Sequence, residues 1–166
     1  MAVDMFIKID GIKGDSTDDK HKDEIEVVAF SHRISQAAGG AHSAQGAHTG
    51  GRADHEDFVI TKRLDTASPI LAQYVCTGKN IQNIKLTLCR ALGDKTTFMT
   101  YTFKDSIVSS LASSGTHASA DLIPEESMTI RYGAVQWEYT PTDPTGGGKT
   151  GAAIKAGWIT IANKSL

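Results

Sequence analysis

Apolar and polar residues alternate along much of this chain, so that every second residue falls on the same side. In residues 3–9, for example, the apolar positions are Val3, Met5, Ile7 and Ile9. A period of two is typical of a β-strand with one buried face. The same pattern, enriched in Thr, Val, Ile and aromatic residues, predicts further strands at residues 24–35, 58–64, 83–91, 97–113, 127–140 and 157–162.

Some of these strands are joined by short connections, such as a turn at Gly93 and Asp94. Neighbouring strands with short turns between them pair in the antiparallel sense. Closing such a sheet on itself hides its edges from other chains. We therefore predict a mainly β fold, an antiparallel β-barrel or sandwich, as a single domain over residues 1–166.

The predicted strand at residues 24–35 changes character halfway along. Its first half places apolar residues on one face, namely Ile25, Val27 and Ala29. In the second half the same face is polar, with Ser31, Arg33 and Ser35. We expect the strand to begin over the core and to continue past it, where its second half meets another partner or solvent.

One helix is predicted at residues 68–77. Ser68 is suited to cap its N-terminus, Pro69 fits the first helical position, and Gly78 can end the helix in the left-handed conformation. One face of this helix is apolar, with Ile70, Leu71, Tyr74 and Val75. We expect that face to pack on the barrel or to close one end of it.

The segment from Gln36 to Asp57 contains almost nothing that could pack into a core. It holds five of the sixteen glycines, together with many alanines and three histidines. A loop of this length in a compact domain is usually functional or disordered. Ordering it costs conformational entropy, which contacts with a partner surface could offset.

The composition is that of an ordinary soluble chain, long enough to bury a core. Of its 166 residues 40% are apolar, and the net charge is −2. Basic residues are spread along the sequence, which argues against a nucleic-acid binder. No apolar run is long enough to span a membrane. The N-terminus does not resemble a secretory signal, so we expect synthesis in the cytoplasm and any export by another route.

The two cysteines, Cys76 and Cys89, both lie in apolar surroundings, in QYVCTG and LTLCRA. Free cysteine is among the most buried residue types. We therefore expect both to be buried and structural. A disulfide between them stays open, because the sequence gives no distance.

The stretch GGGKT at residues 146–150 resembles the end of a phosphate-binding P-loop, but the rest of that pattern is missing. The first glycine of the motif would fall at position 143, which is Asp143. Only five residues separate Gly151 from Gly157, too few for the helix that would hold a phosphate. We interpret this stretch as a loop.

Two further patterns resemble metal sites without completing them. His42, His48 and His55 are six and seven residues apart, which matches no common zinc pattern. In residues 15–26 the calcium-loop positions are occupied by Asp15, Thr17, Asp19, Asp23 and Glu26. However, Lys20 replaces the required glycine, and no flanking helices are predicted. We expect solvated histidines, an acidic surface turn, and no metal or other cofactor.

No catalytic site can be assembled from the sequence. There is no Gly-x-Ser-x-Gly elbow, and neither cysteine stands at a predicted helix start. Glu125 and Glu126 follow Pro124 in a predicted turn, where we expect them to be solvated. His117 lies in a loop of small residues and is expected to be solvated as well. We therefore predict that the protein is not an enzyme.

Several stretches resemble the Hcp family (haemolysin-coregulated proteins). The most specific are KIDGIKG near the N-terminus, the helix start ASP at residues 67–69, the strand end VQWEYTP, and Gly157-Trp158 followed by ANKSL. The resemblance covers nearly the whole chain in the order of the family.

This resemblance implies a structural tube subunit of the bacterial type VI secretion system. Hcp-like proteins are β-barrels with one helix, and they assemble into hexameric rings that stack as a hollow tube. A contractile sheath drives the tube out, a VgrG-type spike protein tips it, and secreted effectors can ride in the lumen. The implied partners are thus other copies of the chain, spike, sheath and effectors, with no nucleic acid and no membrane insertion. Export to the medium or a target cell then needs no signal peptide.

The resemblance also indicates contact residues. Residues 36–57 stand where Hcp-like proteins carry a long extension that reaches neighbouring subunits or rings. Candidate ring contacts in it are Gly39, His42, His48, Arg52 and His55. Candidates for the lumen wall or a subunit contact are Ser31, Arg33 and Ser35, with a solvated strand end as the alternative. Ile159 stands where the family often has Asp, so local ring contacts are expected to differ.

A second function stays open at this point. The same barrel could act as a monomeric binding module that uses the His-rich loop for a ligand. A large, stable ring would favour the tube subunit. A monomer whose loop becomes ordered on binding a metal would favour the binding module.

Overall fold

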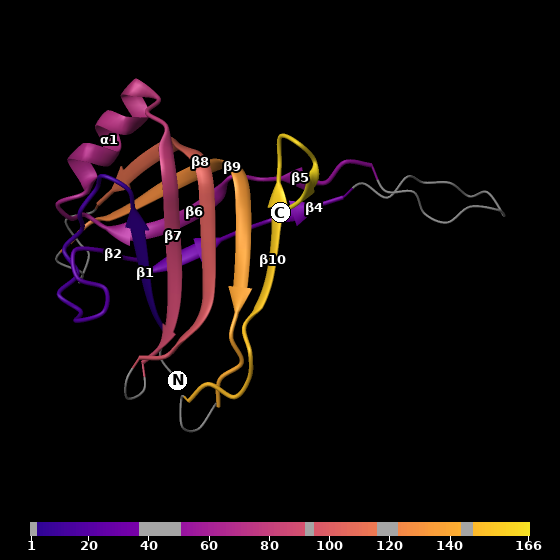
Figure 1. Ribbon diagram of the computed structural model, residues 1–166. Helices are drawn as coiled ribbons and strands as arrows, with labels where there is room; N and C mark the ends of the chain where they lie inside the picture. Colours follow the sequence, from indigo (N-terminus) through magenta and orange to yellow (C-terminus); the bar gives the residue numbers. More distant parts are fainter. Residues whose placement is uncertain (1–2, 37–50, 92–94, 116–122, 144–147) are drawn as a thin grey trace.

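The computed structural model describes residues 3–36, 51–91, 95–115, 123–143 and 148–166. It contains eleven strands and one helix in these residues (Figure 1). In chain order they are β1 (Val3–Ile9), β2 (Ile25–Glu26), β3 (Ala29–Ser31), β4 (Ile34–Ser35), β5 (Asp54–His55), β6 (Phe58–Arg63), α1 (Ser68–Thr77), β7 (Ile81–Arg90), β8 (Thr97–Ser114), β9 (Glu125–Tyr139), β10 (Ile154–Ile159) and β11 (Lys164–Ser165). The predicted mainly β fold with one helix is confirmed. The predicted turn at Gly93 and Asp94 lies outside the described residues.

Nine of the strands form one antiparallel sheet in the order β11-β10-β9-β8-β7-β1-β2, with β6 paired to β9 and β3 paired to β6. The sheet closes through residues 25–31. There the Val27 amide donates to Met5 of β1 at 2.9 Å, and the next amide, of Val28, donates to Thr61 of β6 at 2.8 Å. One short segment therefore joins the two ends of the sheet.

This change of partner corrects the prediction of one continuous strand at residues 24–35. Ile25 and Val27 are buried as expected, but Ala29 is exposed and Phe30 faces the core instead. The buried face switches between Val27 and Val28 because consecutive amides pair with strands on opposite sides. The segment is consequently divided into β2, β3 and β4.

The long hairpin of β8 and β9 bends at one point and so contributes to both sides of the barrel. At the bend Asp105 has a φ of 49°, and it lies opposite Gly133. A Cβ atom on Gly133 would be only 3.2 Å from the Cβ atom of Asp105, so glycine allows this close approach. Before the bend β9 pairs with β6, and after it β9 pairs with β10.

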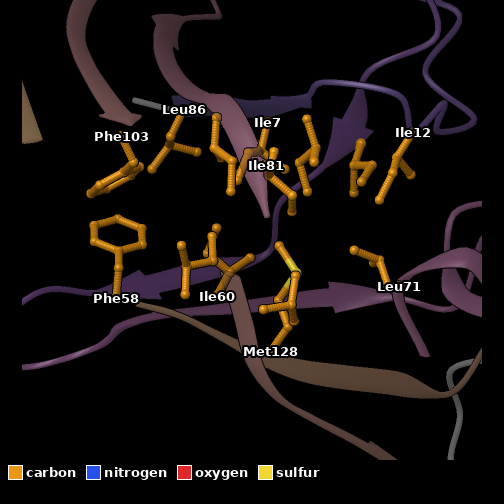
Figure 2. Packing of buried hydrophobic residues seen from close by; sticks show 14 of the residues in the cluster. Ile7, Ile12, Phe58, Ile60, Leu71, Ile81, Leu86, Phe103 and Met128 are labelled. Atoms are coloured by element: carbon orange, nitrogen blue, oxygen red, sulfur yellow. The ribbon is translucent and has the colours of Figure 1, made fainter. Parts of the chain in front are cut away.

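The core fills the space enclosed by the sheet and α1. Figure 2 shows Phe103 and Phe58 facing each other, with Met128 and Leu71 on the same side as Phe58. The two phenyl rings have their centroids 4.7 Å apart at 54°, a favourable tilted arrangement. Burying a side chain of this size contributes about 1.5–3 kcal/mol. The core therefore holds the closed part of the barrel together.

The helix begins and ends at the predicted residues, but its N-terminal cap differs. Gly78 ends it with a φ of 60°, as predicted. The N-cap position is Ala67, whose methyl side chain cannot accept a hydrogen bond, and the Ser68 hydroxyl is used instead in a buried cluster described below. Leu71 and Tyr74 are buried against the barrel, whereas Ile70, predicted on the same face, is exposed. Within the described residues, no helix is long and apolar enough to cross a membrane.

Candidate functional site

Residues 32–36 and 51–57, which we call the arm, leave the barrel next to β10 (Figure 1). Their strands β4 and β5 form a separate two-stranded sheet that pairs Ile34 with His55 and Ser35 with Asp54. The Gln36 side chain also donates to the Gly51 carbonyl at 2.7 Å. The second half of the segment 24–35 thus finds its partner in the same chain, within the region predicted as a loop.

At the base of the arm two imidazoles share one hydroxyl. His32 Nε2 and His55 Nδ1 lie 2.8 and 3.1 Å from the Tyr132 hydroxyl oxygen. We call these three residues the His–Tyr–His cluster. His32 follows β3, His55 belongs to β5, and Tyr132 belongs to β9. The cluster therefore joins both chain segments of the arm to the barrel wall.

Aromatic rings of the barrel surround His32. Its ring centroid lies 5.2 Å from Phe58, 6.0 Å from Tyr101 and 6.3 Å from Trp137. Burial lowers the pKa of His32, and the nearby His55 lowers it further. Burial also lowers the pKa of His55. Both rings are thereby held neutral near pH 7, the state in which one nitrogen donates and the other accepts.

Two arginines attach the arm to the barrel on its outer side. Arg52 donates through Nη2 to the carbonyls of Thr160 and Ile161, in the turn that joins β10 to β11. Arg131 of β9 pairs with Asp57 at 3.0 Å. Both arginines are exposed, so each ion pair or hydrogen bond contributes little on its own. The direction in which the arm leaves the barrel is nevertheless fixed at several points.

The side of the barrel beside the arm has an incomplete strand edge. β10 pairs with β9 along its whole length, but on the other side β11 pairs only with Trp158 and Ile159, and the Leu166 amide donates to Gly157. Near this edge Ile154 is 66% exposed, and Ile161 is 81% exposed. An uncovered edge with apolar side chains is a surface to which another chain can bind.

The structure places the predicted contact residues as follows. Ser31 pairs with Val59 on the barrel, Arg33 is exposed and lies 3.4 Å from Glu56 across the arm, and Ser35 pairs with Asp54. Arg52 and His55 are brought to the barrel wall by the contacts described above. Gly39, His42 and His48 lie outside the described residues. Whether any of these residues contacts another subunit stays a prediction.

The sequence analysis missed His32 and Tyr132. A signal for His32 was present, since it follows Phe30 with a period of two and so belongs to the apolar face of that segment. Nothing in the sequence linked it to Tyr132, which is a hundred positions away. Only closure of the sheet brings the two together.

A second polar cluster lies inside the closed part of the barrel, beneath the start of α1. Lys62 has a side chain with 0% exposure and pairs with Glu126, 2% exposed, at 2.9 Å and with Asp65 at 2.7 Å. The hydroxyls of Ser68 and Ser113 donate to Glu126 at 2.7 and 2.9 Å. We call these five residues the buried ion-pair network.

The network corrects the prediction that Glu125 and Glu126 are solvated. Both belong to β9, where alternate residues face opposite sides, so Glu125 is exposed and Glu126 is buried. Burial alone would raise the pKa of Glu126, but hydrogen bonds from Ser68, Lys62 and Ser113 lower it below its usual value. The carboxylate is therefore ionised and fully partnered, which indicates a structural role.

A cysteine, a histidine and a carboxylate also form a chain of side-chain contacts. Cys89 Sγ is 3.5 Å from His21 Nε2, and His21 Nδ1 is 2.8 Å from Glu24. The order is that of a catalytic triad, which the sequence did not reveal. However, Cys89 is buried, and burial raises the pKa of its thiol. Since the thiolate is the nucleophile, this thiol is not activated. Cys76 is exposed, contrary to the prediction, and both thiols are free.

The remaining candidate motifs have protein partners. In residues 15–26 Asp18 contacts Lys95, which lowers the Asp18 pKa, Asp23 pairs with Lys13, and Asp15 accepts from Thr66. No group of three or more His, Cys, Asp or Glu residues that could hold a metal occurs in the described part of the chain. After GGGKT the chain continues into strand β10, not into the helix that a P-loop requires.

Comparisons with known proteins give a consistent result. A protein-family model described as "Type VI secretion system effector, Hcp" matches residues 6–139. The protein hcp1 of Pseudomonas aeruginosa is 36% identical over 159 residues, which cover 95% of each chain. A solved "structure of a type six secretion system protein" superposes with a TM-score of 0.92 at 36% identity and covers 99% of this chain and 100% of that one. The crystal structure of Hcp1 from Salmonella typhimurium gives a TM-score of 0.81 at 33% identity, with both chains fully covered.

Proposed function

Because the chain belongs to the Hcp family of type VI secretion system proteins, we propose that it assembles into hexameric rings that stack into a hollow tube. The family is one of structural, secreted proteins without enzymatic activity. The whole chain then acts as one domain whose surfaces contact further copies of itself. Rings and stacks of identical subunits need complementary surfaces and no catalytic groups.

One observation carries this proposal: the incomplete edge of β10 and the arm lie on the same side of the barrel (Figure 1). On the other side the sheet is closed by residues 25–31. An asymmetric subunit of this kind supports heterologous contacts, in which one surface binds a different surface of the next copy. Such contacts form a ring when the rotation closes.

The same assembly defines the partners that we propose. A tube exposes its two end faces to a VgrG-type spike protein and its outer wall to sheath proteins, and its lumen holds effectors for export. Ser31, Arg33 and Ser35 are proposed for the lumen wall or a subunit contact, because Ser31 and Arg33 are exposed polar residues where the barrel meets the arm. Arg52 and His55 are proposed for the ring contact of the arm. The protein would leave the cytoplasm through this machinery.

The assembly is tested on purified, tag-free protein by negative-stain electron microscopy and by mass from light scattering. We expect rings with a central hole and a mass of six times 17.7 kDa, or about 106 kDa. Replacing Ile154 by Asp places a charge on the incomplete edge, which we expect to shift the mass towards single subunits. Ile70→Asp on α1 is the matched control, because Ile70 is also an exposed isoleucine but lies away from that edge.

The outcomes separate the alternatives. If the Ile154→Asp variant still forms rings, the tube subunit is supported, but Ile154 of β10 is not part of the contact. A uniform monomer of the unaltered protein at high concentration would contradict the ring itself. A monomer whose arm becomes protected from hydrogen exchange on adding zinc or nickel would support the binding module that uses the His-rich loop.

A further inference from the structure

The His–Tyr–His cluster is the polar contact that ties both segments of the arm to the barrel wall. Tyr132 lies in the barrel strand β9, whereas His32 belongs to the first segment of the arm and His55 to the second. If the two imidazoles leave the hydroxyl, the polar side-chain attachments that remain among the described residues are Arg52 to the β10–β11 turn and Asp57 to Arg131 and Ser109. Arg52, Arg131 and Ser109 are exposed, so water can replace their contacts easily.

The hydrogen-bond balance of the cluster depends on the charge of its histidines. A tyrosine hydroxyl has one proton to donate and an oxygen that accepts. With both rings neutral, one imidazole donates to the oxygen and the hydroxyl donates to the bare nitrogen of the other, so that each group is satisfied. A protonated imidazole has N–H groups on both nitrogens and can only donate. Two protonated rings would then point two donors at one oxygen and leave the hydroxyl proton without an acceptor.

The surroundings of the two rings also disfavour positive charge. Phe58, Phe103 and Trp137 surround His32 with apolar surface, and Tyr101 lies beside it. Two protonated imidazoles would repel each other across the hydroxyl. Around His55 the charged neighbours are Asp54, which favours its protonation, and Arg52, which opposes it. Asp57 is near the Tyr132 hydroxyl, but its carboxylate is paired with Arg131, and Glu56 is paired with Arg33.

We propose that the His–Tyr–His cluster makes the attachment of the arm dependent on pH, so that the arm is held at neutral pH and released when both imidazoles take up protons. The inference concerns the arm within one subunit and does not require a ring. It extends the proposed function at one point only: ring contacts made by the arm would then weaken at acidic pH.

The direction of the pH dependence of arm docking follows from proton linkage. Docking lowers the pKa of both imidazoles below the value of about 6.5 that a solvated histidine has. The released arm therefore binds more protons than the docked arm, and docking is fully favoured above about pH 6.5. It weakens as the pH falls through the lowered pKa values of the docked state. For each pKa unit by which docking lowers one imidazole, the opening equilibrium rises about tenfold.

Hydrogen–deuterium exchange of the full chain tests this proposal, read on peptides covering residues 29–36 and 51–58. We expect these peptides to exchange at least about tenfold faster at pH 5.0 than at pH 7.5 after correction for intrinsic exchange, while β7 and β9 stay protected. The double variant His32→Gln/His55→Gln keeps side chains that can hydrogen-bond to Tyr132 but do not titrate. In this variant the exchange ratio between the two pH values should fall towards one, since neither cluster histidine is left to link arm docking to pH.

His21→Gln is the matched control, because it removes a partly buried histidine that contacts Cys89 and Glu24 on another part of the barrel. It should retain the full pH response of the arm. If the double variant does not fold, as judged by circular dichroism, His55→Gln alone should reduce the response. Equal protection at both pH values in the unaltered protein, or an unchanged response in either cluster variant, would overturn the proposal. Light scattering on the same samples reports ring formation separately, so a monomer with a pH-dependent arm would contradict only the ring.

Discussion

Strand β9 contributes a residue to each of two polar clusters, which keep their polar groups hydrogen-bonded in different ways. Glu126, near its start, belongs to the buried ion-pair network, and Tyr132, at its middle, belongs to the His–Tyr–His cluster. The first is charged and lies in the closed part of the barrel under α1. The second is neutral and lies where the arm leaves the barrel.

The two clusters consequently lose their contribution to stability in different pH ranges. Because hydrogen bonds lower the pKa of Glu126, its contribution to stability is present above about pH 4.5 and is lost as the pH falls through the lowered value. Because docking lowers the pKa of both histidines, the attachment of the arm begins to weaken below about pH 6.5, the pKa of a solvated histidine. As the pH falls, the attachment of the arm therefore begins to weaken before the buried ion-pair network does.

The largest effect is expected from breaking the buried ion-pair network. Lys62→Met removes the only side-chain cation that pairs with Glu126 among the described contacts and leaves a buried carboxylate without a counter-ion. Such a change costs about 3–5 kcal/mol of the free energy of unfolding, which urea denaturation at pH 7 measures.

A second variant shows whether the loss comes from the unpaired charge. In Lys62→Met/Glu126→Leu both ions are replaced by apolar side chains, which often restores stability at a buried pair. We expect the double variant to recover most of the loss. If it is as unstable as Lys62→Met, packing around α1 would account for the effect instead of charge.

A smaller effect is expected at the other cluster. Tyr132→Phe removes the shared hydroxyl and leaves the ring in place, so both imidazoles lose a hydrogen-bond partner. We expect a loss of about 1 kcal/mol in the free energy of unfolding. Faster exchange should occur at residues 29–36 and 51–58 even at pH 7.5. Unchanged exchange in the arm would show that the hydroxyl does not hold it.

The smallest effect on the free energy of unfolding is expected from replacing the two cluster histidines. With His32→Gln/His55→Gln the remaining cluster on β9 titrates only at acidic pH, so the contribution of these clusters to the free energy of unfolding should be constant between pH 7.5 and 5.0. Urea denaturation at a series of pH values, with the unaltered protein in parallel, measures the difference. A variant that still loses as much stability as the unaltered protein over this range would place the titrating group elsewhere.

Much of this fold could be predicted from local sequence patterns. The alternation in residues 3–9, 58–64, 97–113 and 127–140 gave strands close to the observed bounds, because a strand exposes every second residue to the same side. The helix at residues 68–77 and its end at Gly78 also followed from local chemistry. Motifs along nearly the whole chain identified the Hcp family, which the comparisons confirmed.

The sequence by itself determined most of the long strands, where the helix lies and which family the chain belongs to. It could not determine what each strand pairs with. The break between Val27 and Val28, the burial of Glu126 with Lys62, and the meeting of His32 and His55 at Tyr132 were all decided by the closure of the sheet. The physical reason is that periodicity records the side on which a residue faces, whereas pairing depends on contacts between residues far apart in the chain.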